Sequence, residues 1–420
     1  MKRLICAFLS VICLLLCFSS CSKSNDESKQ TFTVDFGMCK YGSYIYFKNG
    51  VGYADTLSKT NCKLAKYNVN SGKISAACLD ATCDHTKESA CPFSSFTNLY
   101  HIENDIIYYS AERGKLMAYD INDESAYLVL DPTTFNSSRP YVFLDNKVYF
   151  VSTELKEGKE NGVANSYIYY MCCADYGATS FDKLFEITPT YHQELTGSVL
   201  EYDEAGNCIG ERPTYDVSAT EFLHIFNERI YFRDGESGNI YTTNMSGEDK
   251  TFVTAFDEFT FLGSCTVYNE YMLFLTAGDS DACEYTYPSI DGKSCLTDYA
   301  SRSKLYSLNM NTATTVLLTD NASDYAVDNG KVYYYPWGYR FYGYEQEVAI
   351  RNYCSGELYS VNMDGTQKEL LYSDSQKLFL HYIVSEESAL CLVIDYSSEG
   401  HSECRYAELN LKNQKIKYLD

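Results

Sequence analysis

Short apolar runs alternating with turn residues fill the chain after residue 30. One run is a β-branched or apolar residue followed by two more aromatic or apolar residues. Its seven copies begin at Ile45, Ile107, Val148, Ile230, Leu273, Val332 and Leu392. A turn cue usually precedes each copy, as Asn104-Asp105 does, and an apolar stretch precedes most of these turns. This order predicts a strand, a tight turn and a second strand.

A second motif follows further along each unit. It reads Leu305-Tyr306-Ser307-Leu308-Asn309-Met310 and recurs from Leu358 to Met363. Looser copies begin at Leu64, Leu116, Ile240 and Arg405, and a weak copy begins at Tyr169. Turn residues and another short apolar run come next, so each unit contains a second hairpin.

Two hairpins per unit predict a four-stranded antiparallel sheet with strands A to D. We count seven such units over residues 31–420. One such sheet cannot bury both of its faces alone, so the units must stack. Stacking around a central channel predicts an all-β fold, a β-propeller of seven four-stranded blades. Paired β-sandwiches are the alternative. Residues 31–36 are expected to add a strand to the last blade and close the ring.

A family resemblance accompanies the second motif. The turn Val361-Asn362-Met363-Asp364-Gly365 resembles the repeat of TolB-like and related bacterial extracytoplasmic propellers. The resemblance is to the repeat alone, and it implies a fold without an activity.

The N-terminus has the pattern of an export signal. Residues 1–20 combine Lys2 and Arg3 with an apolar run that is short for a transmembrane helix, which predicts a signal peptide. The following Phe18-Ser19-Ser20-Cys21 resembles a bacterial lipobox. That resemblance implies a lipoprotein with acyl chains such as palmitate on Cys21, anchored in the cell membrane and facing outside the cytoplasm. Polar residues 21–30 are expected to form a flexible tether. An ordinary signal peptide and an uncleaved anchor are the alternatives.

The charge of the chain restricts its partners. The formal net charge is −23, with 57 acidic residues against 34 Lys and Arg. Such a surface repels nucleic acid and anionic lipid headgroups, so we exclude nucleic-acid binding. The lipid bilayer is then a partner only through the anchor on Cys21.

Long segments are predicted on one face of the propeller. The A–B and C–D turns are short in nearly every unit. The long B–C segments are residues 48–63, 151–168, 276–304 and 335–357, and the long D–A segments are 78–97 and 188–221. B–C and D–A connections share one face, so this face is expected to carry function. Neutral drift in tolerant loops is the alternative.

One of these segments carries a set of metal ligands. Cys78, Cys83, His85 and Cys91 offer three thiolates and an imidazole, a set that suits tetrahedral zinc in a closed, structural site. Disulfides, expected outside the cytoplasm, and free thiols are the alternatives. The run is similar to a loop of uncharacterised Firmicutes-type propeller lipoproteins, a resemblance that implies no function.

Other cysteines have simpler expected roles. Cys172 and Cys173 are adjacent on a predicted strand, so their side chains are expected on opposite faces as small buried hydrophobes. Cys283 and Cys295 flank the long segment of unit 5, and a disulfide between them would close it.

An aromatic run is the candidate ligand-binding segment. Trp337, Tyr339, Arg340 and Tyr342 enter the long B–C segment of unit 6. Exposed rings there would stack on sugars or grip a peptide, with Arg340 facing a carboxylate. Packing of the segment against itself is the alternative.

Enzyme motifs are missing from the sequence. It contains no G-x-S-x-G, H-E-x-x-H, Walker or dinucleotide-binding pattern. We therefore expect a non-enzymatic binding or scaffold domain for a cell-envelope protein, peptide or glycan. A carbohydrate hydrolase or lyase with acids at the channel mouth is the alternative, and a structural or sensory subunit of a membrane complex is a third hypothesis.

Overall fold

The fold is described from a computed structural model. It describes residues 38–49, 62–80, 83–85, 91–132, 137–155, 167–187, 192–202, 208–218, 220–234, 237–255, 261–289, 294–345, 348–354, 356–373, 378–385, 387–396 and 402–419. The expected signal peptide, the tether and Cys21 lie outside these residues, as does the predicted closing strand at residues 31–36.

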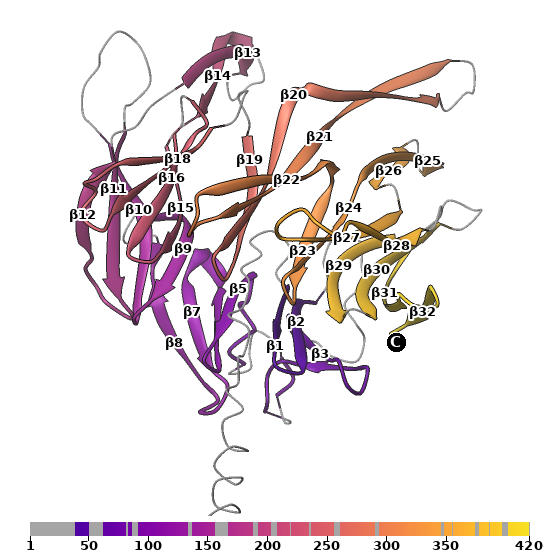
Figure 1. Ribbon diagram of the computed structural model, residues 1–420, viewed down its shortest axis with the longest axis horizontal. Coiled ribbons are helices and arrows are strands. Elements are labelled where there is room, and N and C mark those ends of the chain that lie inside the picture. The colour runs from indigo at the N-terminus through magenta and orange to yellow at the C-terminus, as the bar shows by residue number, and fades with distance from the viewer. Residues whose placement is uncertain are drawn as a thin grey trace, which may run out of the picture.

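Seven four-stranded antiparallel sheets form a ring, which confirms the predicted all-β propeller (Figure 1). Blades 1 to 3 comprise β1 (Met38–Tyr41), β2 (Tyr44–Lys48), β3 (Leu64–Asn68) and β4 (Lys73–Ala76); β5 (Asn98–Glu103), β6 (Ile106–Ser110), β7 (Leu116–Asp120) and β8 (Ser125–Leu130); and β9 (Ser137–Leu144), β10 (Lys147–Leu155), β11 (Tyr167–Asp175) and β12 (Asp182–Ile187).

Blades 4 to 7 continue the same order of strands. They comprise β15 (Glu221–Phe226), β16 (Arg229–Arg233), β17 (Ile240–Asn244) and β18 (Thr251–Thr254); β19 (Phe261–Tyr268), β20 (Tyr271–Pro288), β21 (Cys295–Asn309) and β22 (Thr314–Ala322); β23 (Asp324–Asp328), β24 (Lys331–Tyr335), β27 (Glu357–Asn362) and β28 (Glu369–Ser373); and β29 (Leu378–Ser385), β30 (Ser388–Tyr396), β31 (Ser402–Asn410) and β32 (Lys415–Tyr418).

Apart from the seven blades, the described residues contain few secondary-structure elements. Two further two-stranded sheets are β13 (His192–Tyr202) with β14 (Cys208–Ser218), and β25 (Trp337–Glu345) with β26 (Val348–Cys354). A 3₁₀ turn spans Glu112–Gly114. Within the described ranges, no helix has the length and hydrophobicity needed to cross a membrane.

The A–B turns have the backbone that the sequence predicts. In blades 2, 3, 4 and 6 the two central residues both have positive φ, as in Asn104 (50°) and Asp105 (63°), or Asn329 (53°) and Gly330 (75°). This is the type I′ conformation, whose twist matches that of the flanking strands. Asn, Asp and Gly occupy most of these positions because they tolerate left-handed φ at the lowest cost.

The last polar residue of strand C initiates the C–D turn. In blade 1 the side-chain oxygen of Asn68 accepts hydrogen bonds from the backbone N–H groups of Asn70 and Ser71, at 3.0 and 2.9 Å. Asp120, Asn244, Asn309 and Asn410 make equivalent bonds in blades 2, 4, 5 and 7. The repeated Asn or Asp of the second motif is therefore explained by an Asx turn.

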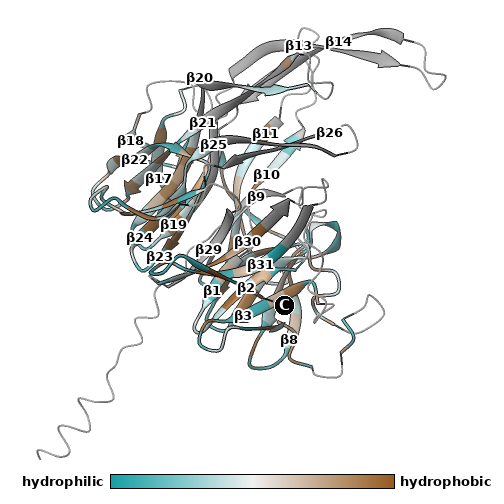
Figure 2. Ribbon diagram, turned by 90° about the vertical axis from the view of Figure 1, so that its right-hand side faces the viewer, coloured by the Kyte–Doolittle hydropathy of each residue, from teal (hydrophilic) through white to brown (hydrophobic). Residues whose placement is uncertain are grey.

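Apolar side chains fill the spaces between adjacent blades. Seven clusters of buried residues occur among the described residues, and each joins one blade to the next. The cluster between blades 7 and 1 contains Ile45 and Phe47 from β2 with Leu390 and Tyr406 from β30 and β31. Hydrophobic colouring follows the blade strands in Figure 2. The ring therefore closes through the same packing that joins its other blades.

Polar contacts add to this closure. The Tyr406 hydroxyl donates to the Lys48 carbonyl at 3.2 Å, across the contact between blades 7 and 1. The Lys40 ammonium lies 3.0 Å from Asp328, so an ion pair links β1 of blade 1 to β23 of blade 6. Blade 7 already has four strands of its own without residues 31–36.

Three of the long segments contain strands that the sequence analysis missed. Hairpin β13–β14 lies in the D–A connection between blades 3 and 4, and β25–β26 lies in the B–C connection of blade 6. In blade 5, β20 and β21 stay paired as far as Pro288 and Cys295. These extensions lie in the upper part of Figure 1. Their strand connectivity places all three on one face, as expected.

Two glycines hold neighbouring blades in close contact. Gly247, in the C–D turn of blade 4, has φ +81°, and a Cβ there would lie 2.4 Å from Cγ of Phe185 on β12. Gly365, in the C–D turn of blade 6, has φ +81°, and its Cβ would lie 2.8 Å from Cγ1 of Val316 on β22. A larger residue would push the blades apart.

We predict that Gly247→Ala and Gly365→Ala each destabilise the propeller by about 2–4 kcal/mol, because left-handed strain adds to overpacking. Gly330→Ala is the matched control, since Gly330 has φ +75° but no atom within 4 Å of its Cβ position. The control should cost about 1 kcal/mol from strain alone. Urea denaturation measures the free energy of unfolding, and equal losses in all three variants would contradict close blade contact.

Candidate metal centre

The candidate metal centre lies in the D–A connection between blades 1 and 2. Cys78 lies two residues after the end of β4. The intervening Ala77 is held to β3, because its N–H donates to the Leu64 carbonyl at 3.0 Å. The second ligand, Cys83, is held by its own backbone, because its N–H donates to the Asp80 carbonyl at 3.2 Å. Cys91 lies just before a tight turn, because the Ser94 N–H donates to its carbonyl at 3.1 Å.

Two phenylalanines anchor the end of this connection. Phe93 and Phe96 are 0% and 2% exposed, and both pack against the ring of Tyr109 from β6. The Tyr109 hydroxyl also donates to the Pro92 carbonyl at 2.8 Å. These anchors were not predicted, although Phe93 and Phe96 are the two phenylalanines of residues 78–97. They hold Cys91 against the core between blades 1 and 2.

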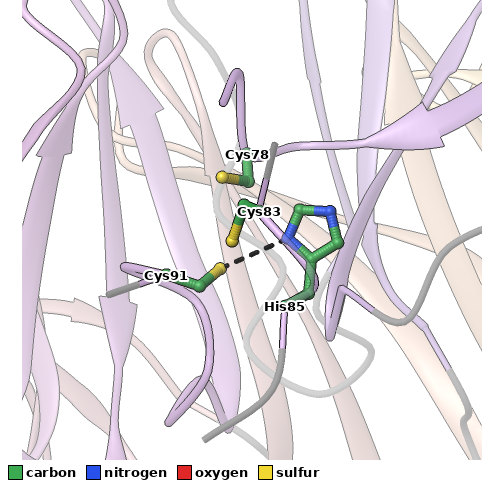
Figure 3. A group of neighbouring side chains, drawn as sticks. All are labelled: Cys78, Cys83, His85 and Cys91. Atoms are coloured by element: carbon green, nitrogen blue, oxygen red, sulfur yellow. Dashed lines mark hydrogen bonds between the residues drawn. The ribbon is translucent and has the colours of Figure 1, made fainter. Parts of the chain in front are cut away.

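The structure brings the four predicted ligands together. One ligand atom from each of Cys78, Cys83, His85 and Cys91 lies within 4.8 Å of the other three, and the side chains converge in Figure 3. In tetrahedral zinc sites, the standard bond lengths place two sulfurs about 3.8 Å apart, and a sulfur and a nitrogen about 3.6 Å apart. Here Cys91 Sγ and His85 Nδ1 are 3.5 Å apart. The separation of these two donor atoms therefore matches that in a tetrahedral zinc site.

Local backbone conformation directs His85 toward the sulfurs. His85 has φ +60°, in the left-handed region that non-glycine residues seldom adopt. Such a conformation costs of order 1–3 kcal/mol, and it is typical of residues at functional sites. The imidazole is the fourth donor of the set, and the set offers four protein ligands without an additional residue.

Burial changes the pKa of two of the three thiols. Cys78 and Cys91 are 8% and 6% exposed, whereas Cys83 and His85 are partly exposed. Burial is the main cause that raises the pKa of Cys78 and of Cys91 above that of an ordinary thiol. Both thiols are therefore protonated near neutral pH when no metal is bound. A divalent cation must displace these protons, so its binding depends on pH.

Two more cysteines belong to the same hydrophobic cluster. Cys39 and Cys62 are 3% and 0% exposed and pack in the core between blades 1 and 2. Burial raises the pKa of Cys39 to about 12. Neither belongs to the group of four converging ligands. No disulfide joins any two of the cysteines whose side chains the structure describes, which include Cys39, Cys62 and the three cysteines of the candidate site.

The other cysteine predictions have mixed outcomes. Cys172 packs between blades 2 and 3 and Cys173 between blades 3 and 4, which confirms that they face opposite sides of β11. The proposed link between Cys283 and Cys295 is wrong. Cys283 pairs with Ala300, whereas Cys295 pairs with Pro288. Five residues of extended strand correspond to about 17 Å, too far for a disulfide.

The aromatic run lies in a hairpin and not in an irregular loop. Trp337 begins β25, and Arg340 pairs with Asn352 of β26. The Asn321 side chain accepts from the Trp337 N–H at 3.0 Å and donates to the Trp337 carbonyl at 3.3 Å, which ties the hairpin base to blade 5. Trp337 is partly buried. The side chains of Tyr339, Arg340 and Tyr342 lie outside the described part, so their ligand-binding role stays a prediction.

Comparisons with known proteins return only distant structural similarity. No protein-family model matches this chain. No curated protein matches it either. An oligogalacturonate lyase in complex with manganese has a TM-score of 0.37 and 10% identity over 90% of this chain and 95% of its own. The acylaminoacyl peptidase of Pyrococcus horikoshii has a TM-score of 0.46 and 11% identity over 94% of this chain and 53% of its own. Similarity this low assigns no activity.

Proposed function

We propose that this protein is an extracytoplasmic binding or scaffold propeller that holds a cell-envelope protein, peptide or glycan on its extended face. The observation that supports this proposal is the placement of the insertions. Hairpins β13–β14 and β25–β26 and the extended pair β20–β21 all leave the ring through B–C or D–A connections. On the opposite face, the A–B and C–D turns of the described residues are short. Insertions on a rigid scaffold are where binding residues concentrate.

The extended face should be required for binding to the cell envelope. We predict that the purified protein is retained by isolated envelope material, and that replacing residues 192–218 with a short Gly-Ser linker lowers retention at least about tenfold. Co-sedimentation measures the retained fraction. Asp123→Ala, an exposed change in a C–D turn of the opposite face, should leave retention unchanged. Equal retention of all three proteins, or none by the wild type, would refute the proposed binding face.

We further propose that Cys78, Cys83, His85 and Cys91 hold one structural zinc ion. Three soft thiolates and one imidazole suit zinc, and four protein ligands leave no open position for a substrate. The 3.5 Å separation of Cys91 Sγ and His85 Nδ1 supports the assignment. When bound, the ion would cross-link the connection between blades 1 and 2.

The full chain, purified in detergent without air, should contain about one zinc per molecule by elemental analysis. His85→Ala and Cys83→Ser should each lower this content, because the site loses a ligand. Cys295→Ser changes an exposed cysteine of the β20–β21 hairpin and should not alter it. Bound zinc should fall as the pH is lowered, because the thiolate ligands take up protons and release the ion. A metal-free protein with oxidised Cys78, Cys83 and Cys91 would disprove the zinc site.

Membrane anchoring through Cys21 completes the proposal. It rests on the resemblance of residues 18–21 to a lipobox and on the polar stretch that follows them. A lipid anchor would keep an acidic propeller near a surface that its charge otherwise avoids.

Cys21→Ser should abolish incorporation of a fatty-acid analogue in growing cells, because the acylated thiol is lost. Cys17→Ser is the matched control, since Cys17 lies four residues earlier within the apolar run. The control should stay labelled. Label that persists in Cys21→Ser would show that the lipid is attached elsewhere.

A further inference from the structure

We propose that Cys83 is an oxidation site at which hydrogen peroxide converts the metal centre into a disulfide and releases the ion. This inference rests on the proposed zinc site and adds its regulation. It concerns a covalent modification of Cys83, followed by bond formation with Cys78 or Cys91.

Cys83 is the most exposed of the three cysteines in the set. The two outer cysteines of the set, Cys78 and Cys91, are buried against the core between blades 1 and 2. Cys83 is partly exposed, and the adjacent Asp84 is exposed. Cys83 is therefore the cysteine of the set that a small oxidant from solvent should reach most easily. Reactive cysteines are generally exposed and ionised to the thiolate. A cysteine that binds a metal is held in the thiolate form.

Two thiols that could resolve an oxidised Cys83 lie close to its sulfur. All ligand atoms of the set lie within 4.8 Å of one another. A disulfide bond is about 2.05 Å long, so a movement of less than about 3 Å joins two of these sulfurs. Cys83 lies between Cys78 and Cys91 in the chain, and both sulfurs are within this reach. The other buried cysteines of the cluster, Cys39 and Cys62, are outside the converging set.

The chemistry balances without any further reactant. The Cys83 thiolate attacks one peroxide oxygen, the O–O bond breaks, and the second oxygen leaves as water after taking up a proton. The resulting sulfenic acid is attacked by the Cys78 or Cys91 thiolate, which forms the S–S bond and releases a second water after another proton is taken up. Two electrons pass from the two sulfurs to the peroxide. Two of the four ligands are then lost, so the cation dissociates.

The consequence is a connection that is cross-linked in both states. Before oxidation the metal would join four side chains, and afterwards a disulfide joins two of them. Phe93 and Phe96 hold the end of the segment in either state, because their packing on Tyr109 involves none of the ligands. His85 is released only in the oxidised state. The extended face would therefore change locally at this segment while the ring stays closed.

The test uses the full chain, purified in detergent with zinc and without air, and then treated with hydrogen peroxide. A zinc-sensitive chromophore should report release of the bound metal. Differential alkylation and mass spectrometry should find Cys83 linked to Cys78 or Cys91. A thiol reductant with added zinc should restore the original content. Cys295→Ser should release zinc at the wild-type rate, because Cys295 is an exposed cysteine of blade 5, whereas the set packs between blades 1 and 2.

A second variant separates oxidation from metal binding. Cys83→His keeps four zinc ligands but removes the reactive sulfur, so release by peroxide should slow at least about tenfold. Zinc that stays bound while peroxide is consumed, a link between Cys78 and Cys91 with Cys83 unmodified, or equally fast release from Cys83→His would each overturn the inference. Absence of zinc from the untreated wild type would instead refute the proposed metal site.

Discussion

The packing of each blade between two neighbours is the interaction on which the structure depends. A four-stranded sheet has two apolar faces, and here each is covered only by the adjacent blade. Ile45 and Phe47 of blade 1 are fully buried because Leu390 and Tyr406 of blade 7 lie against them. Removing any blade would expose two such clusters, at roughly 25 cal/mol for each Å² of apolar surface. The ring must therefore be complete, and change is tolerated mainly in the connections at its two faces.

The repeating part of the fold could be predicted from the sequence because local chemistry determines it. Asn104-Asp105 specifies a type I′ turn, and Asn68 specifies an Asx turn, whatever the neighbouring blades contain. Hairpins β13–β14 and β25–β26 were missed because they break the repeat. Polar and aromatic residues mix in β25, with Gly338 and Gly343 inside it, so the strand has no clear alternation. Backbone pairing with β26 makes it a strand, and one sequence does not show that pairing.

The candidate site was predictable to a different degree. The close spacing of Cys78, Cys83, His85 and Cys91 identified all four converging residues, because ligands in one short segment need little tertiary information. Their depth was not predictable. Cys78 and Cys91 are buried because Tyr109 and Tyr119, from the next blade, pack around Phe93. The mistaken link between Cys283 and Cys295 shows the converse, since the register of β20 and β21 separates residues that looked close along the chain.

The propeller orders its two long D–A connections in different ways. The segment between blades 3 and 4 forms hairpin β13–β14, whose paired backbone groups offset the entropy lost on ordering. The described residues of the segment between blades 1 and 2 form no strand ladder, so side chains must supply the order. Phe93 and Phe96 fix its end. Near its middle, Cys83 and His85 are only partly buried, and their apolar contacts alone are a weak constraint. A bond to a shared metal or between two sulfurs constrains such residues without requiring more buried surface. The ligand set therefore occurs in a connection whose described residues form no strand ladder and include partly exposed ligands.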